Sequence, residues 1–219
     1  MVWTNRGDDL LQRLLATEFD ADGALANALL NEVFAGFPVA RLAVLLDSDN
    51  EAAIHAGAWI LSELGADAHP LIDHTANLLA HPRPAVRYHS LDAVMVAALD
   101  SDAGPLSKAA ALIDDSEPTV RRRAMQLLAQ LTSPQLRAAR AAVADPRIRA
   151  ELEWLQKVTE PGWDGAAVLE GLRSTSPIRR RVAVVAASRS DPEEPEIREA
   201  IEGSADPDVA SWQIPSGKR

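Results

Sequence analysis

The stretch that decides the fold is Glu117-Pro118-Thr119-Val120-Arg121-Arg122-Arg123-Ala124. It joins a turn that contains Pro to a β-branched residue and an Arg, and apolar residues then return after Val120 at Ala124, Leu127 and Leu131. This spacing places one apolar stripe on one face of a helix. Pro is harmless in the first turn, because its missing N–H would have no partner there. The stretch therefore predicts the start of an amphipathic helix.

The same pattern returns along the chain, with departures in the later copies. The copies are Arg83-Pro84-Ala85-Val86-Arg87, Asp145-Pro146-Arg147-Ile148-Arg149, Ser176-Pro177-Ile178-Arg179 and Asp206-Pro207-Asp208-Val209-Ala210, and a divergent copy runs from Asn50 to His55. Successive aliphatic positions are 28 to 34 residues apart. Because this length fits a turn and two short helices, each copy is expected to begin the second helix of a pair.

The remaining amphipathic stretches complete the predicted architecture. First helices are expected at 38–46, 69–80, 104–114, 134–144, 164–173 and 194–203. Residues 8–17 and 21–35 are expected to form two capping helices, with Asp8, Asp9, Asp20 and Asp22 near their starts, and residues 214–219 to fray. One helix pair cannot bury its stripe alone, so the pairs must stack. The predicted fold is all-α: an α-solenoid of about five to six helix pairs in a single domain over 1–219, with caps in 1–37 and repeats in 38–213.

Composition excludes several classes of protein. The chain has 219 residues, 47% of them hydrophobic, and no Cys, so it is expected to fold without disulfides, thiolate nucleophiles or sulfur-ligated zinc. The N-terminus lacks a signal-peptide pattern and no apolar run reaches a membrane span, which favours a soluble, cytoplasmic protein. The net charge is −10, and residues 1–110 carry −9 of it.

The Asp-Pro-x-Val-Arg-x-x-Ala pattern resembles HEAT repeats of the short bacterial type over about residues 38–213. The resemblance implies that the second helices line the concave face of a superhelix that binds another macromolecule. It also implies that the recurrent Arg pairs with a carboxylate of a neighbouring repeat, and Asp114, Asp115 and Asp145 are available for this. The members of this structural ladder would be Arg87, Arg121, Arg149 and Arg179. Glu160-Pro161-Gly162 interrupts the repeat, and Ala210 stands where the Arg is expected.

A row of second-helix residues is expected to point away from both the apolar stripe and the ladder. Its mixture of aromatic, Met, Arg and acidic residues is typical of interaction surfaces. The binding candidates are Trp59, Glu63, Tyr88, Asp92, Met95, Arg122, Gln126, Glu153 and Trp154. The same offsets also select Ile60, Met125 and Lys157. In the alternative interpretation, Trp59 and Trp154 fill gaps in an Ala-rich core.

Catalytic and metal-binding patterns are weak. The five His residues lie between His55 and His89, but none is paired at i, i+4, and His69 with Asp73 is the nearest match to a metal pattern. We therefore expect no metal, no cofactor and no catalytic residue. His55 occupies the position of the recurrent Arg, which favours a structural role.

The leading hypothesis is a non-enzymatic binding module, an adaptor or scaffold whose concave face holds a protein partner. The acidic N-terminal half would attract a basic partner, such as a toxin that the protein neutralises. The alternative is a nucleic-acid enzyme, because some HEAT-like proteins of this length are alkylpurine DNA glycosylases; Trp59, Asp92 and Trp154 would then hold the nucleotide. The acidity argues against a nucleic-acid partner. Some short-repeat relatives are bilin lyases, but no residue set here indicates tetrapyrrole binding.

Overall fold

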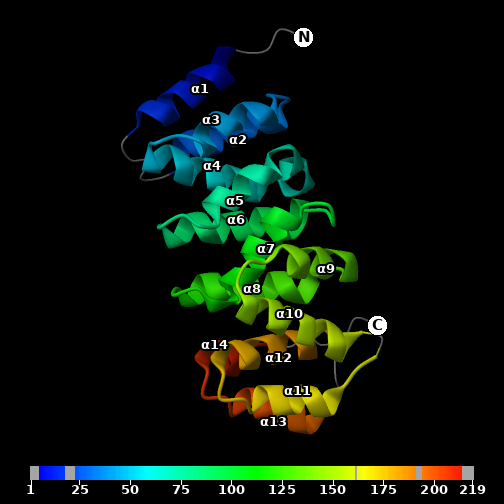
Figure 1. The fold of residues 1–219 in the computed structure, drawn as a ribbon. Coiled ribbons are helices and arrows are strands. Elements are labelled where there is room, and N and C mark those ends of the chain that lie inside the picture. The colour runs from blue at the N-terminus through cyan, green and yellow to red at the C-terminus, as the bar shows by residue number, and fades with distance from the viewer. Residues whose placement is uncertain (1–4, 18–22, 161, 191–193, 214–219) are drawn as a thin grey trace. The chain divides into compact units, whose positions relative to one another are not determined.

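The computed structural model describes residues 5–17, 23–160, 162–190 and 194–213 (Figure 1). Within these ranges the regular structure is entirely helical, with fourteen α-helices and three 3-10 helices, which confirms the predicted all-α class. Two compact units form, Met1–Pro105 and Leu106–Arg219, and the boundary falls within α7 (Ala103–Ala111). None of the described helices combines the length and apolar character that a membrane crossing requires.

Unit 1 is built around the packing of α4 against α6 (Figure 1). The elements are α1 (Asn5–Ala16), α2 (Ala24–Phe34), η1 (Val39–Leu42), α3 (Ala43–Leu46), α4 (Glu51–Glu63), η2 (Gly65–His74), α5 (Thr75–Leu78) and α6 (Pro84–Ala97). Helix α4 also contacts α1, α2 and α3. A Cβ at Gly57 would lie 2.8 Å from Leu46 Cδ2, so the glycine permits the close approach of α3 and α4.

Helices α1 and α2 overlap the ranges 8–17 and 21–35 in which two helices were predicted, and α4 and α6 begin at the predicted starts of second helices. Asn50 caps α4 by accepting from the amides of Ala52 and Ala53, and its Nδ2 donates to the carbonyls of Leu15 and Thr17 at the end of α1. The expected helices at 38–46 and 69–80 differ from prediction, because each begins as a 3-10 segment, η1 and η2. Pro70 inside η2 lacks the amide that an α-helical hydrogen bond needs. Asp20, Asp22 and the tail 214–219 lie outside the described residues.

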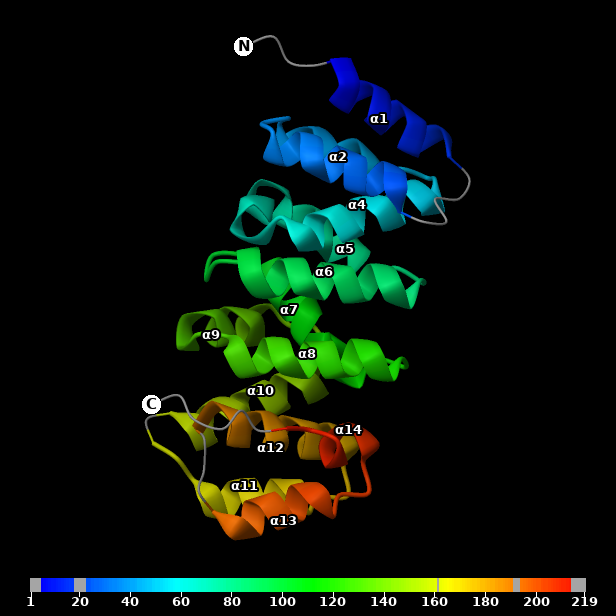
Figure 2. The same cartoon turned by 180° about the vertical axis from the view of Figure 1, so that it is seen from behind.

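Unit 2 is organised around α12 (Figure 2). Its elements are η3 (Leu112–Asp114), α8 (Pro118–Gln130), α9 (Ser133–Ala142), α10 (Pro146–Thr159), α11 (Gly165–Leu172), α12 (Pro177–Ser190), α13 (Pro195–Glu202) and α14 (Pro207–Ala210). Residues 182–187, a run of Val and Ala, are fully buried. Helix α12 can be covered on all sides because this run has no polar face, and it packs against α8, α10, α11 and α14.

The packing of α12 departs from the expected order of the second helices. Repeats that touch only their neighbours in the chain would place α12 against α10 and α14 but away from α8. Instead, α12 contacts both α10 and α8, and Arg189 near its end donates to the carbonyls of Leu128 and Leu131 at the end of α8. The C-terminal part of the chain therefore completes the core of unit 2.

Candidate functional site

The binding row predicted in unit 1 lies on α4 and α6. Trp59, Tyr88, Asp92 and Met95 are half-buried, and Glu63 is exposed. The outward position expected for Ile60 is wrong, because this residue is fully buried. Helix α4 is covered by α3 on one side and α6 on the other, so less of its surface reaches solvent than a single apolar stripe implies.

Two histidines lie beside this row. The rings of His55 on α4 and His89 on α6 have centroids 5.8 Å apart, and Tyr88 contacts His89 edge-on. Burial lowers the pKa of His55, and the positive charges of Arg83 and His89 lower it further. Burial also lowers the pKa of His89, although nearby Asp92 acts in the opposite direction. Both rings therefore accept a proton less readily than an imidazole in water.

The other histidines form separate pairs with carboxylates. His69 Nε2 lies 3.2 Å from Asp102 Oδ2, and His74 Nδ1 lies 2.9 Å from Asp47 Oδ1. Among the described residues, no group of three His, Asp or Glu side chains is arranged to hold a metal ion.

The row predicted in unit 2 divides between two surfaces. Arg122 and Gln126 on α8 are exposed and line one groove, whereas Trp154 on α10 is half-buried and lines a separate pocket. Glu153 is exposed and lines neither. Met125 was expected on the same surface but is fully buried, because α12 packs against this part of unit 2.

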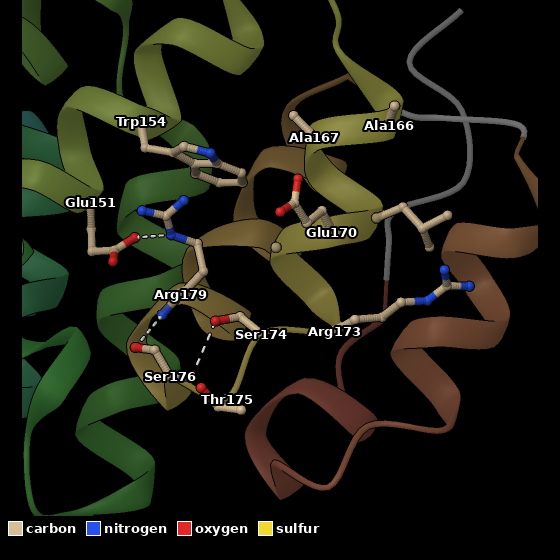
Figure 3. Close-up of a pocket in the computed structure, with 12 residues that line it drawn as sticks. Glu151, Trp154, Ala166, Ala167, Glu170, Arg173, Ser174, Thr175, Ser176 and Arg179 are labelled. Carbon is tan, nitrogen blue, oxygen red and sulfur yellow. Dashed lines mark hydrogen bonds and ion pairs between the residues drawn. The ribbon is translucent and has the colours of Figure 1, made fainter.

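The Trp154 pocket is a cavity of 770 Å³ formed by α10, α11 and the start of α12 (Figure 3). The guanidinium of Arg179 lies 4.4 Å from the centroid of the Trp154 ring, and its Nε donates to Glu151. A Cβ at Gly171 would lie 3.0 Å from the indole, so this glycine lets α11 approach closely. The indole is thus fixed in orientation by a cation on its face and a helix at its edge.

The opposite wall of the Trp154 pocket is formed mainly by small and charged residues. Ala166, Ala167 and Glu170 project from α11 toward the cavity, and the loop from Arg173 to Ser176 closes one end (Figure 3). Glu170 and Arg173 are exposed, and neither forms an ion pair with another described residue. The cavity therefore offers an aromatic surface, apolar methyl groups and one charge of each sign at its rim.

The recurrent Arg has a shared local role. The guanidinium groups donate to the carbonyl six residues earlier in each copy, in the turn that precedes the helix. These bonds join Arg87 to His81, Arg121 to Asp115, Arg149 to Val143 and Arg180 to Ser174, at 2.6 to 2.9 Å. In the shortened copy, Arg180 therefore takes the place that the sequence spacing assigned to Arg179.

Carboxylate pairing between helices is more limited in the described structure. Arg121 pairs with Asp208 on α14, and Arg179 pairs with Glu151 on α10. Asp114 and Asp145, which were candidate partners, instead lie near Arg147, and Asp145 also caps α10. A continuous ladder through Arg87 and Arg149 stays a prediction.

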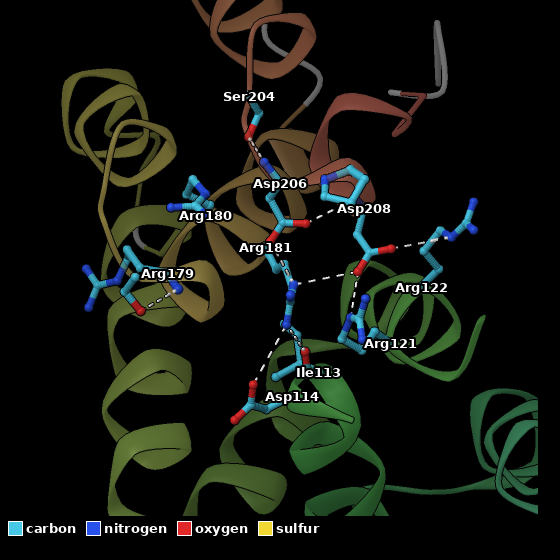
Figure 4. A network of polar contacts seen from close by, with 12 residues as sticks. Ile113, Asp114, Arg121, Arg122, Arg179, Arg180, Arg181, Ser204, Asp206 and Asp208 are labelled. Atoms are coloured by element: carbon cyan, nitrogen blue, oxygen red, sulfur yellow. Dashed lines mark hydrogen bonds and ion pairs between the residues drawn. The ribbon is translucent and has the colours of Figure 1, made fainter. Parts of the chain in front are cut away.

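A buried polar network joins α8, α12 and α14 (Figure 4). Arg181 Nε lies 3.0 Å from Asp206 Oδ2, and its Nη1 donates to the carbonyl of Ile113. Asp208 lies 2.6 Å from Arg121 Nε, 3.6 Å from Arg122 Nε and 3.7 Å from Arg181 Nε. This network could not be predicted from the sequence because its partners are far apart in the chain, although the Asp-Pro-Asp of the last copy is a recognisable capping signal.

The nucleotide-holding set of the alternative hypothesis is divided between the two units. Trp59 and Asp92 belong to unit 1 and Trp154 belongs to unit 2, so they do not form a site within either unit. Searches with the whole chain find no matching protein-family model and no similar curated protein.

Proposed function

We propose that this chain is a non-enzymatic protein-binding module made of HEAT-like helix pairs, and that a partner side chain inserts into the Trp154 pocket. The observation that carries the proposal is the half-buried indole of Trp154, held by Arg179 beside a 770 Å³ cavity. Trp and Arg are the residues most enriched where interfaces derive their affinity, particularly in pockets.

The HEAT-like part of the proposal is supported by the repeated helix starts. Pro stands in the first turn of α6, α8 and α10, and α12 also begins at a Pro. In all four helices an Arg donates back to the preceding turn. The solenoid arrangement accounts for this periodicity, with α12 as the place where the regular order changes.

A basic partner suits the chemistry of the pocket. An inserted Lys or Arg could place its apolar stem against Ala166 and Ala167 while its charge reaches Glu170 at the rim. The charge of −9 on residues 1–110 would attract a basic protein over longer distances and accelerate its encounter. A basic toxin that the chain neutralises is one partner of this kind.

The test is affinity capture with the tagged chain, followed by the same capture with Trp154→Ala. The matched control is Trp163→Ala, because Trp163 is also a half-buried tryptophan of unit 2 but does not line the pocket. We expect Trp154→Ala to reduce retention of a reproducible partner at least tenfold, since hot-spot truncations cost about 2 kcal/mol or more. Trp163→Ala should retain it.

Circular dichroism and thermal melting of both variants distinguish binding from folding. Unchanged partner retention by Trp154→Ala would remove the pocket from the proposal. If Trp154→Ala loses both the helical signal and the retention of the partner, Trp154 belongs to the core instead.

A further inference from the structure

A second hollow on unit 2 differs in chemistry from the Trp154 pocket and shares no lining residue with it. This groove has a volume of 1100 Å³ and is bordered by α8, the ends of α10 and α12, and the residues after α14. Its charged and aromatic lining consists of Arg122, Arg123, Glu160, Arg189 and Trp212. Three guanidinium groups thus face one carboxylate in a protein whose net charge is −10.

Arg189 is a half-buried member of this set. Its Nη1 donates to two neutral carbonyls, Leu128 at 2.9 Å and Leu131 at 2.6 Å. Burial lowers the pKa of Arg189, and the nearby charge of Glu160 only opposes this effect. An additional carboxylate in the groove would stabilise the charged guanidinium, because charge-assisted hydrogen bonds are stronger than bonds to neutral carbonyls.

Arg122 is available at the rim of the groove. Its side chain is 49% exposed, and its nearest carboxylate, Asp208, lies 3.6 Å away. Asp208 makes a closer contact of 2.6 Å with Arg121, so its charge is already largely balanced. Arg122 can therefore turn toward a ligand without leaving a buried carboxylate unpaired.

Glu160 points to the kind of ligand that the groove would take. Its Oε1 is buried and has no hydrogen-bond partner among the described residues, while its other oxygen lies 3.7 Å from Arg137. An unsatisfied buried acceptor requires a donor. The backbone of an extended peptide carries N–H donors, whereas a phosphate backbone carries none, and a nucleic acid would also be repelled by the net charge.

We propose that this groove binds an extended acidic segment of a partner protein. Glu or Asp carboxylates of the segment accept hydrogen bonds from Arg122 and Arg189, and one of its backbone N–H groups donates to Glu160. The inference goes beyond the Trp154 pocket and does not depend on it, since the two surfaces have different linings and opposite preferences for charge.

The test measures fluorescence anisotropy of a labelled peptide of alternating Glu and Ser, with a Lys-Ser peptide, a Gln-Ser peptide and a single-stranded oligonucleotide of equal charge as comparators. The parent chain should bind the Glu-Ser peptide most tightly, and the affinity should fall with added salt. The double variant Arg122→Gln with Arg123→Gln should bind it roughly ten-fold more weakly, because it removes two of the three cations that line the groove.

The matched control is Lys157→Gln with Arg198→Gln, which removes the same charge from exposed positions outside the groove. It should bind like the parent, and so should Trp154→Ala, which separates this inference from the proposed function. Equal binding of the Lys-Ser or Gln-Ser peptide, equal weakening by both double variants, or no binding of the Glu-Ser peptide would overturn the proposal. Tighter binding of the oligonucleotide would overturn it in favour of a nucleic-acid surface.

Discussion

Asp208→Asn should strongly destabilise unit 2, because Asp208 supplies a buried charge shared by three arginines. Asp208 is 2% exposed, and Arg121 and Arg181 next to it are also largely buried. In the buried part of the network the guanidinium groups of Arg121 and Arg181 face the carboxylates of Asp206 and Asp208, so the charges balance. Removing one carboxylate leaves an uncompensated buried cation.

The size of the effect can be worked out from the remaining contacts. Arg181 keeps Asp206 at 3.0 Å, and Arg121 keeps the carbonyls of Asp115 and Ser116. Breaking a buried ion pair costs about 3–5 kcal/mol, and these contacts place Asp208→Asn near the lower value. A loss of about 3 kcal/mol corresponds to a fall of roughly 10 °C in the unfolding midpoint of a chain of this size.

The assay is thermal unfolding followed by circular dichroism at constant pH and salt. Asp145→Asn is the control, because Asp145 caps α10 from an accessible position and Asn caps helices equally well. It should leave the midpoint almost unchanged. A midpoint for Asp208→Asn within about 2 °C of the parent would refute the reasoning, since an unbalanced buried charge costs more free energy than so small a shift represents.

Two further predictions concern the core and the histidine pair. Met125→Ala should lower the free energy of unfolding by about 2–5 kcal/mol, because the side chain is fully buried, whereas its exposed neighbour Gln126→Ala should change it by less than about 0.5 kcal/mol. Urea unfolding measures both, and similar values would contradict the structure. The pKa of His55 and of His89 is below 6.5 in the folded protein, so the unfolded chain binds these protons more readily. Stability should therefore decrease as the pH falls below 6.5, and the double variant His55→Gln with His89→Gln should flatten this dependence in urea titrations at about pH 7.5 and about pH 5.5; an unchanged slope would exclude the pair as its source.

The positions of most helices follow directly from local chemistry. Pro118 and Pro146 mark helix starts because they fit the first turn, and the apolar spacing after Val120 places the buried face. These signals act over a few residues, so the chain alone reveals them. The 3-10 character of η2 was harder to predict from the sequence, since it depends on how Pro70 and the flanking turns are accommodated.

The candidate sites were harder to predict because they depend on contacts between distant segments. The offsets that selected Trp154 and Gln126 as one surface assume that each second helix meets only its neighbours in the chain. Helix α12 contacts both α8 and α10, and this buries Met125 and separates the Trp154 pocket from the Arg-lined groove. Arg180 could have been identified as the fourth Arg that donates to its preceding turn by counting from Pro177, since it stands three residues after the Pro, as Arg121 does after Pro118.

The central position of α12 also affects how unit 2 can form during synthesis. The bond from Arg121 to Asp208 spans 87 residues, and those from Arg189 to α8 span about 60. At a translation rate of about 5–20 residues per second, the apolar face of α8 remains uncovered for on the order of ten seconds before α12 is synthesised. The nascent chain of unit 2 is therefore exposed to aggregation for longer than a repeat that closes on its next neighbour, and chaperone binding should concentrate on α8 until α12 has left the ribosome.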